Sequence, residues 1–146
     1  MNLQFEVYGK IQRSIDETFD AMYNPNKLSG YFTTGGASAP LVEGTTVMWD
    51  FHDFPGAFPV KVIRSEKPKL IELEWDSAEK GKKTRVVIKL ESVEENSTKV
   101  TIAESGWSET EEGLKASYGN CMGWSQMLAA MKAYVEYGIN LRQGFY

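Results

Sequence analysis

Hydrophobic residues recur with a helical period near the C-terminal end of the chain, between Tyr118 and Gly138. Successive residues of a helix are rotated by about 100°, so seven apolar side chains of this segment fall within one arc of about 140°. The pattern predicts a long amphipathic helix that buries this arc, preceded by a short helical piece and a break near Gly119. The arc consists of Cys121, Trp124, Met127, Leu128, Met131, Tyr134 and Val135.

Before this helix, most of the chain alternates between apolar and polar residues, as a strand with one buried face does. The first alternating segment covers residues 3–12, and a short strand is expected around residues 37–42. Turn residues such as Phe54-Pro55-Gly56 separate the later segments. The pattern predicts a curved antiparallel sheet of about six to seven strands. The longer strands after the first are expected at residues 45–51, 58–65, 70–75, 84–91 and 99–107.

Two short helices should follow the first strand. Ser14 and Glu17 have the spacing of a capping box, and Asn24 before Pro25 is typical of an N-cap and a first helical position. A second capping box at residues 108–111 is expected to begin the C-terminal helical region. The predicted fold class is α+β, with the sheet wrapped around the long C-terminal helix in a single domain of residues 1–146.

Composition and charge are those of an ordinary globular protein. The chain has 146 residues, 42% of them hydrophobic, and a net charge of −4 with acidic and basic residues interspersed. This charge distribution lacks the excess of basic residues that is typical of nucleic-acid-binding proteins. No apolar run is long enough to span a membrane. The N-terminus lacks a signal-peptide pattern, and a single cysteine excludes an internal disulfide. We therefore expect a cytoplasmic protein with no nucleic-acid partner and no membrane insertion.

Five segments carry a resemblance to a known family. They are SIDETF at residues 14–19, NPNKLSGYF at 24–32, KPKLIELEW at 67–75, TKVTI at 98–102, and Gly123-Trp124 followed by Leu128 and Met131. Their order resembles the START and birch-pollen-allergen (SRPBCC) superfamily, and within it the homologues of the activator of heat-shock protein 90 ATPase. The resemblance spans residues 3 to about 138. It implies a helix-grip fold with a cavity between the sheet and the last helix, suited to a mainly apolar small molecule.

Large apolar side chains on the inward faces are the candidate ligand-binding residues. Val47, Trp49 and Phe51 share one face of their strand, as do Leu73 and Trp75 of another. Such a stripe is core packing more often than pocket lining, because close packing is the norm. The helix-grip resemblance makes the two interpretations about equal. The candidate set is Trp49, Phe51, Phe58, Trp75, Trp107, Trp124, Met127, Leu128 and Met131.

The sequence contains no recognisable motif for catalysis or for metal binding. The only histidine, His52, cannot form a metal cluster alone, and its neighbour Asp53 would point to the opposite face of a strand. Cys121 lies on the apolar arc and is expected to pack as a small hydrophobe. We expect no metal, no cofactor and no catalytic residue. An enzyme would need a group such as Tyr118 or Tyr134 inside an apolar pocket.

The sequence leaves three functions open. The first is binding of a small hydrophobic ligand, a lipid or an aromatic metabolite, between the sheet and the last helix. The second is a protein-interaction or stress-response module of the co-chaperone kind. Small residues such as Ala129 and Ala133 on the last helix, with the aromatic tail at residues 139–146, would suit either a monomer or a weak homodimer. The third is a cyclase-type or hydrolase-type enzyme that uses the same cavity.

Overall fold

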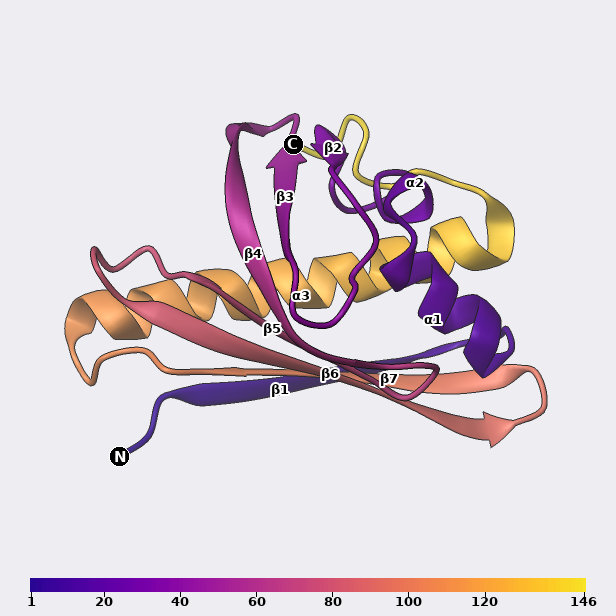
Figure 1. Cartoon of the computed structure of the whole chain (residues 1–146), viewed down its shortest axis with the longest axis horizontal. Helices are drawn as coiled ribbons and strands as arrows, with labels where there is room; N and C mark the ends of the chain where they lie inside the picture. The colour runs from indigo at the N-terminus through magenta and orange to yellow at the C-terminus, as the bar shows by residue number, and fades with distance from the viewer.

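A computed structural model describes all residues of the chain, 1–146 (Figure 1). Seven strands form one antiparallel sheet in the order β1-β7-β6-β5-β4-β3-β2. The strands are β1 (Gln4–Ile11), β2 (Gly36–Ala37), β3 (Thr46–Phe51), β4 (Phe54–Glu66), β5 (Leu70–Asp76), β6 (Lys83–Glu94) and β7 (Ser97–Ser105). The helices are α1 (Ile15–Tyr23), α2 (Pro25–Leu28) and α3 (Glu111–Tyr137).

The long helix α3 lies across one face of the curved sheet. Figure 1 shows β3 and β4 rising away from β1, β6 and β7, with α3 passing behind β3 and β4 and with α1 and α2 near one end of the sheet. This arrangement confirms the predicted α+β helix-grip fold, with two short helices after the first strand.

The core follows the alternation seen in the sequence. Val86, Ile88 and Leu90 of β6 are at most 3% exposed, and Val100 and Ile102 of β7 are fully buried, whereas the residues between them are half-buried or exposed. Each such side chain contributes about 1.5–3 kcal/mol by leaving water. The period of two therefore reflects burial of one sheet face under α3.

The predicted N-caps of the two short helices, Ser14 and Asn24, are confirmed, but the Glu17 carboxylate makes no return bond to the Ser14 N–H, so the capping box is only half formed. The Ser14 hydroxyl accepts a hydrogen bond from the backbone N–H of Glu17 at 3.2 Å, at the start of α1. The side chain of Asn24 accepts one from the backbone N–H of Asn26 at 3.0 Å, and Pro25 opens α2. Each contact satisfies an amide that has no partner within its helix.

Two expectations about the start of α3 are wrong. The N-cap is Thr110, whose hydroxyl accepts from the N–H of Gly113 at 3.0 Å, and not Ser108, whose carbonyl instead accepts from the N–H of Thr110. Nor does α3 break near Gly119, because it is continuous from Glu111 to Tyr137. An interior glycine costs a helix only about 1 kcal/mol, which the burial of the apolar face of α3 outweighs.

Several strand boundaries also differ from the prediction. The turn between β3 and β4 consists of His52 and Asp53, so Phe54, expected in the turn, already belongs to β4. The short strand expected around residues 37–42 is confined to β2 at Gly36–Ala37. The last strand, β7, begins at Ser97 and ends at Ser105, two residues before the predicted end. Turn residues mark a chain reversal, but the exact register depends on cross-strand pairing.

The C-terminal end of α3 is tied to the start of the fold. Gly138 caps the helix in the left-handed conformation (φ 70°). Two residues earlier, the Glu136 carboxylate accepts from the N–H of Gln12 at 3.0 Å and from Lys132 at 2.6 Å. Burial acts to raise the pKa of Glu136, but these two partners outweigh it and lower the pKa. After Gly138, the chain folds back along α3 as the C-terminal tail (residues 139–146).

Candidate functional site

A cavity of about 220 Å³ lies between α3, the end of β3, β5 and the C-terminal tail. Aromatic side chains form much of its wall, and the remaining lining comes from one side of α3 and two residues of the tail. We call it the α3 cavity. Its lining residues are Phe32, Phe51, Trp75, Gly119, Asn120, Met122, Gly123, Trp124, Gln126, Arg142 and Tyr146.

Five aromatic residues around this cavity form a ring of pairwise contacts, in which the last residue contacts the first. We call them the aromatic cluster. Phe32 contacts Phe51 (5.1 Å between ring centroids), which contacts Phe58 (5.8 Å), which in turn contacts Trp75 (5.8 Å). Trp75 contacts Trp124 (5.5 Å), and Trp124 returns to Phe32 (5.2 Å). These tilted, stacked and edge-to-face pairs stabilise the wall beyond the area that they bury. The cluster joins α3 to three strands and to the segment after α2.

A single buried carboxylate holds the cluster to the sheet. Glu104 of β7 is 1% exposed and accepts hydrogen bonds from the indole N–H of Trp75 (2.9 Å) and of Trp124 (2.8 Å). The Thr84 hydroxyl (2.6 Å) and the Asn120 side-chain amide (3.0 and 3.1 Å) bond to the same carboxylate. Indole and amide N–H groups can only donate, and so both oxygens of Glu104 act as acceptors for them.

None of these four partners carries a formal charge. Donors from β5, β6 and α3 converge on Glu104, which makes it the polar junction between the sheet and the helix. A buried carboxylate without such donors would be strongly destabilising. The network therefore fixes the orientation of the two indole rings that line the α3 cavity.

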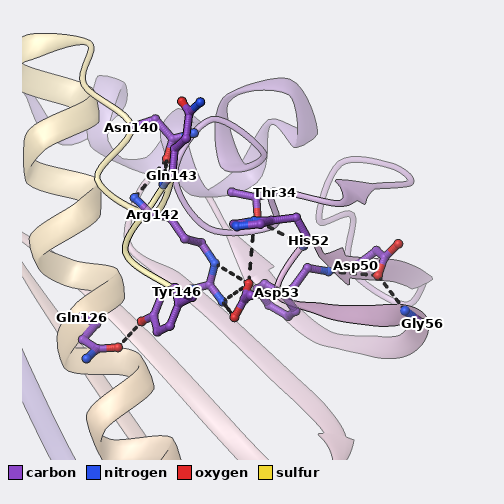
Figure 2. Close-up of polar contacts among 11 residues, drawn as sticks. Thr34, Asp50, His52, Asp53, Gly56, Gln126, Asn140, Arg142, Gln143 and Tyr146 are labelled. Atoms are coloured by element: carbon purple, nitrogen blue, oxygen red, sulfur yellow. Dashed lines mark hydrogen bonds and ion pairs between the residues drawn. The ribbon is translucent and has the colours of Figure 1, made fainter.

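The C-terminal tail covers the mouth of this cavity. In Figure 2, Arg142 points from the tail to Asp53 in the β3–β4 turn, with N–O distances of 2.8, 2.9 and 3.2 Å. The guanidinium carbon of Arg142 also lies 4.8 Å from the Phe51 ring centroid and 4.5 Å from that of Tyr146. The Tyr146 hydroxyl hydrogen-bonds Gln126 of α3. These contacts hold the tail against the helix.

A second, smaller cavity of about 130 Å³ lies between the tail and α3. Its lining is mainly apolar and includes Met127, Ala130, Leu141 and Phe145. Three residues line both cavities and so form the boundary between them: Gln126, Arg142 and Tyr146.

The structure brings several of the predicted ligand-binding residues together. Phe51, Trp75 and Trp124 line the α3 cavity, and Phe58 completes the aromatic cluster. Trp49 is fully buried and contacts two cluster members edge-on, Phe32 at 5.6 Å and Trp75 at 5.8 Å.

The other predicted residues lie elsewhere. Met127 lines the smaller cavity under the tail, and Met131 is buried in the main core. Leu128 lines a groove between α3 and β1. Trp107 stacks on Phe5 of β1 at 5.5 Å and does not line the α3 cavity.

Sequence reasoning missed the polar residues of the site. Glu104 had an available signal, because it shares the inward face of its strand with Val100 and Ile102. Asn120 lies four residues before Trp124 and therefore on the same side of α3. Arg142 and Tyr146 gave no such signal, because their places depend on how the tail folds back.

The residues that the sequence offered for metal or catalytic chemistry do not line the α3 cavity. No group of three or more His, Cys, Asp or Glu side chains could hold a metal ion. His52 and Asp53 lie in a turn, 3.8 Å apart, so they do not point to opposite faces as expected. Tyr118 is 65% exposed, and Tyr134 packs against Tyr31, so neither tyrosine lines the α3 cavity. No helix is both long and apolar enough to cross a membrane.

Fold and cavity together define a helix-grip protein of the START and birch-pollen-allergen (SRPBCC) superfamily. The sequence profile of the family described as "Activator of Hsp90 ATPase homolog 1-like protein" matches residues 12–136. The match covers most of the chain, and the chain belongs to this family.

Solved structures of similar fold come from several sources. SSP2350 from Staphylococcus saprophyticus is 22% identical, with a TM-score of 0.80 and coverage of 96% of both chains. The Aha1 dimer from Colwellia psychrerythraea is 23% identical, with a TM-score of 0.76 and coverage of 93% of this chain and 98% of that one. DynU16, from the dynemicin biosynthetic locus, is 22% identical with a TM-score of 0.78, and the match covers 92% of this chain but 48% of DynU16. At these identities the likeness shows the fold. No curated protein matches the chain.

Proposed function

We propose that this domain binds a small, mainly apolar molecule, such as an aromatic metabolite or a short lipid, in the α3 cavity and acts in the cytoplasm. The observation that carries the proposal is a cavity of about 220 Å³ with five aromatic side chains in its wall. Ligand sites are typically concave and apolar, with a few polar groups that set orientation. Asn120, Gln126 and Arg142 would supply these polar groups.

The volume limits the size of the ligand. An engineered apolar cavity of about 150 Å³ holds one benzene molecule, so the α3 cavity suits a ligand of one or two rings. Larger ligands would need the tail to move. Displacing Tyr146 and Arg142 would join the α3 cavity to the smaller one, and the two volumes together reach the lower end of the range of about 300–1,000 Å³ that is usual for ligand pockets.

Filling the cavity should abolish binding without unfolding the protein. Gly123 of α3 lines the cavity, and a Cβ added there meets no atom within 4 Å. We expect Gly123→Leu to weaken binding at least about tenfold, and to leave the free energy of unfolding unchanged or raise it by up to about 1 kcal/mol, because leucine favours a helix more than glycine does. Binding would be measured by NMR titration with a library of apolar aromatic compounds and short-chain lipids.

Lys115→Leu is the matched control, because it adds a leucine to an exposed position of the same helix that does not line the cavity. It should leave binding unchanged. Equal binding by the wild-type protein and Gly123→Leu would place the ligand elsewhere. No binding by any library member to the wild-type protein would contradict the proposal.

A second candidate, self-association, is favoured by an exposed apolar stripe along α3. Leu114, Tyr118 and Met122 are 36%, 65% and 58% exposed and lie about one helical turn apart on the same side. The relative from Colwellia psychrerythraea is described as a dimer. Light scattering should show a wild-type dimer at high concentration and a monomer for Met122→Lys, with Tyr137→Lys as an exposed control. A wild-type monomer at every concentration would exclude self-association.

A further inference from the structure

The charges around the α3 cavity do not balance. Arg142 is the only lining residue with a formal charge, and its bonds to Asp53 neutralise it. Glu104 lies directly behind the cavity wall and has no cationic partner, because all of its donors are neutral. The uncompensated charge next to the cavity is therefore negative.

The aromatic wall adds to this negative potential. The face of an aromatic ring carries the negative part of its quadrupole and attracts cations within about 6 Å. The indole N–H groups of Trp75 and Trp124 both point at Glu104, within 2.9 Å, so the positive edges of these rings are directed at the carboxylate. Both N–H groups are therefore occupied and do not bond a ligand in the cavity.

The chain already places one organic cation at the mouth of the cavity. The guanidinium of Arg142 lies within 5 Å of two ring centroids, those of Phe51 and Tyr146. Its position shows that this wall accommodates a delocalised cation next to its aromatic rings.

Free hydrogen-bond acceptors for a cation are scarce. Both oxygens of Glu104 are already bonded, and the Gln126 carbonyl oxygen is bonded to Tyr146, which leaves the Asn120 side-chain oxygen as the one amide acceptor of the lining without a partner. A primary ammonium would bring three N–H donors into this cavity and lose their bonds to water. A quaternary ammonium has no N–H group and needs only aromatic surface and a negative potential.

We propose that the α3 cavity selects a quaternary ammonium ligand, a trimethylammonium group on a small organic body, over a neutral molecule of the same shape. This inference rests on the proposed function, because it assigns the ligand class of the same cavity. The source of the group, a free metabolite or a lipid head group, does not change its chemistry.

The test compares choline with 3,3-dimethyl-1-butanol, in which carbon replaces the charged nitrogen and the shape is unchanged. NMR titration of the wild-type chain would follow the indole N–H signals, with Trp75 and Trp124 as reporters and Trp107 as a reference away from the cavity. We expect choline to bind at least about fivefold more tightly than the alcohol and to shift the two reporter signals. n-Butylamine, a primary amine, should bind more weakly than choline.

A variant of the tail provides an independent check. Arg142→Gln removes the chain's own cation and frees Asp53, so choline should bind at least about threefold more tightly than to the wild-type protein. Lys115→Gln makes the same charge change on the exposed side of α3 and should leave the affinity unchanged. An equal gain in both variants would contradict a local effect at the cavity.

The two proposals fail differently. Binding of 3,3-dimethyl-1-butanol as tight as that of choline overturns the quaternary ammonium assignment and supports a general apolar pocket. Binding of apolar library members without any binding of choline would likewise overturn the quaternary ammonium assignment and support a general apolar pocket. If neither these two ligands nor any library member shifts the Trp75 and Trp124 signals, both proposals are overturned.

Discussion

Replacing Glu104 by alanine is expected to lower the free energy of unfolding by about 3–5 kcal/mol. The substitution leaves the indole N–H groups of Trp75 and Trp124 without an acceptor, together with the donors of Thr84 and Asn120. Each unsatisfied buried donor costs about 1–3 kcal/mol, although such costs do not add fully when groups share one network. Urea unfolding followed by tryptophan fluorescence measures the difference.

Two further substitutions separate the network from general effects on the sheet. Glu104→Gln keeps the shape and one acceptor oxygen but brings an NH₂ group towards donors, so it should cost less than alanine but still more than about 1 kcal/mol. Glu91→Ala removes a glutamate from an exposed position of β6 and should change stability by less than about 0.5 kcal/mol. A loss below about 1 kcal/mol for Glu104→Ala would mean that the network does not hold α3 to the sheet.

The second large effect is expected at Trp124 of α3. This residue is 2% exposed, contacts Phe32 and Trp75, and donates to Glu104. Trp124→Ala should cost about 3–5 kcal/mol, because it removes a large buried ring and leaves a void. Trp124→Phe keeps a ring in the cluster but removes the donor to Glu104, and should cost about 1–3 kcal/mol.

Trp107→Phe is the matched control for the loss of an indole N–H. Trp107 is 5% exposed, and its Nε1 has no hydrogen-bond partner. Its replacement by phenylalanine removes no bond, and the loss of stability should be smaller than for Trp124→Phe. A double-mutant cycle that combines Trp124→Phe with Glu104→Gln should give a coupling of at least about 0.5 kcal/mol. Additive effects would show that the two groups do not stabilise one another.

Much of the fold could be predicted because burial imposes a local period. The alternation in β6 and β7 and the apolar arc of α3 follow from which face of each element is buried. The caps at Ser14 and Asn24 were predictable for a similar reason, since each bonds an amide only two or three residues away. The start of α3 was not, because Ser108 and Thr110 both suit an N-cap, and it is Thr110 that bonds the N–H of Gly113 in the structure.

The site could be predicted only in part. Large aromatic residues on inward faces indicated Phe51, Trp75 and Trp124, which line the cavity. The same rule selected Trp107, which packs against β1 instead, because size and parity do not show where along the sheet a residue will meet α3.

Long-range polar contacts could not be predicted from local sequence patterns. The donors to Glu104 come from three different elements, and Arg142 meets Asp53 across 89 positions of sequence. Such pairs depend on the assembled topology and not on the spacing of neighbouring residues.

Binding in the α3 cavity is tested most directly by measuring intermolecular NOEs between the tightest-binding small ligand and the side chains of the protein. A ligand bound in the α3 cavity should give NOEs to the rings of Phe51, Trp75 and Trp124, all of which line it. NOEs confined to exposed residues such as Tyr137, 70% exposed, would contradict binding in this cavity, because they would place the ligand on the surface and leave the aromatic cluster as plain core.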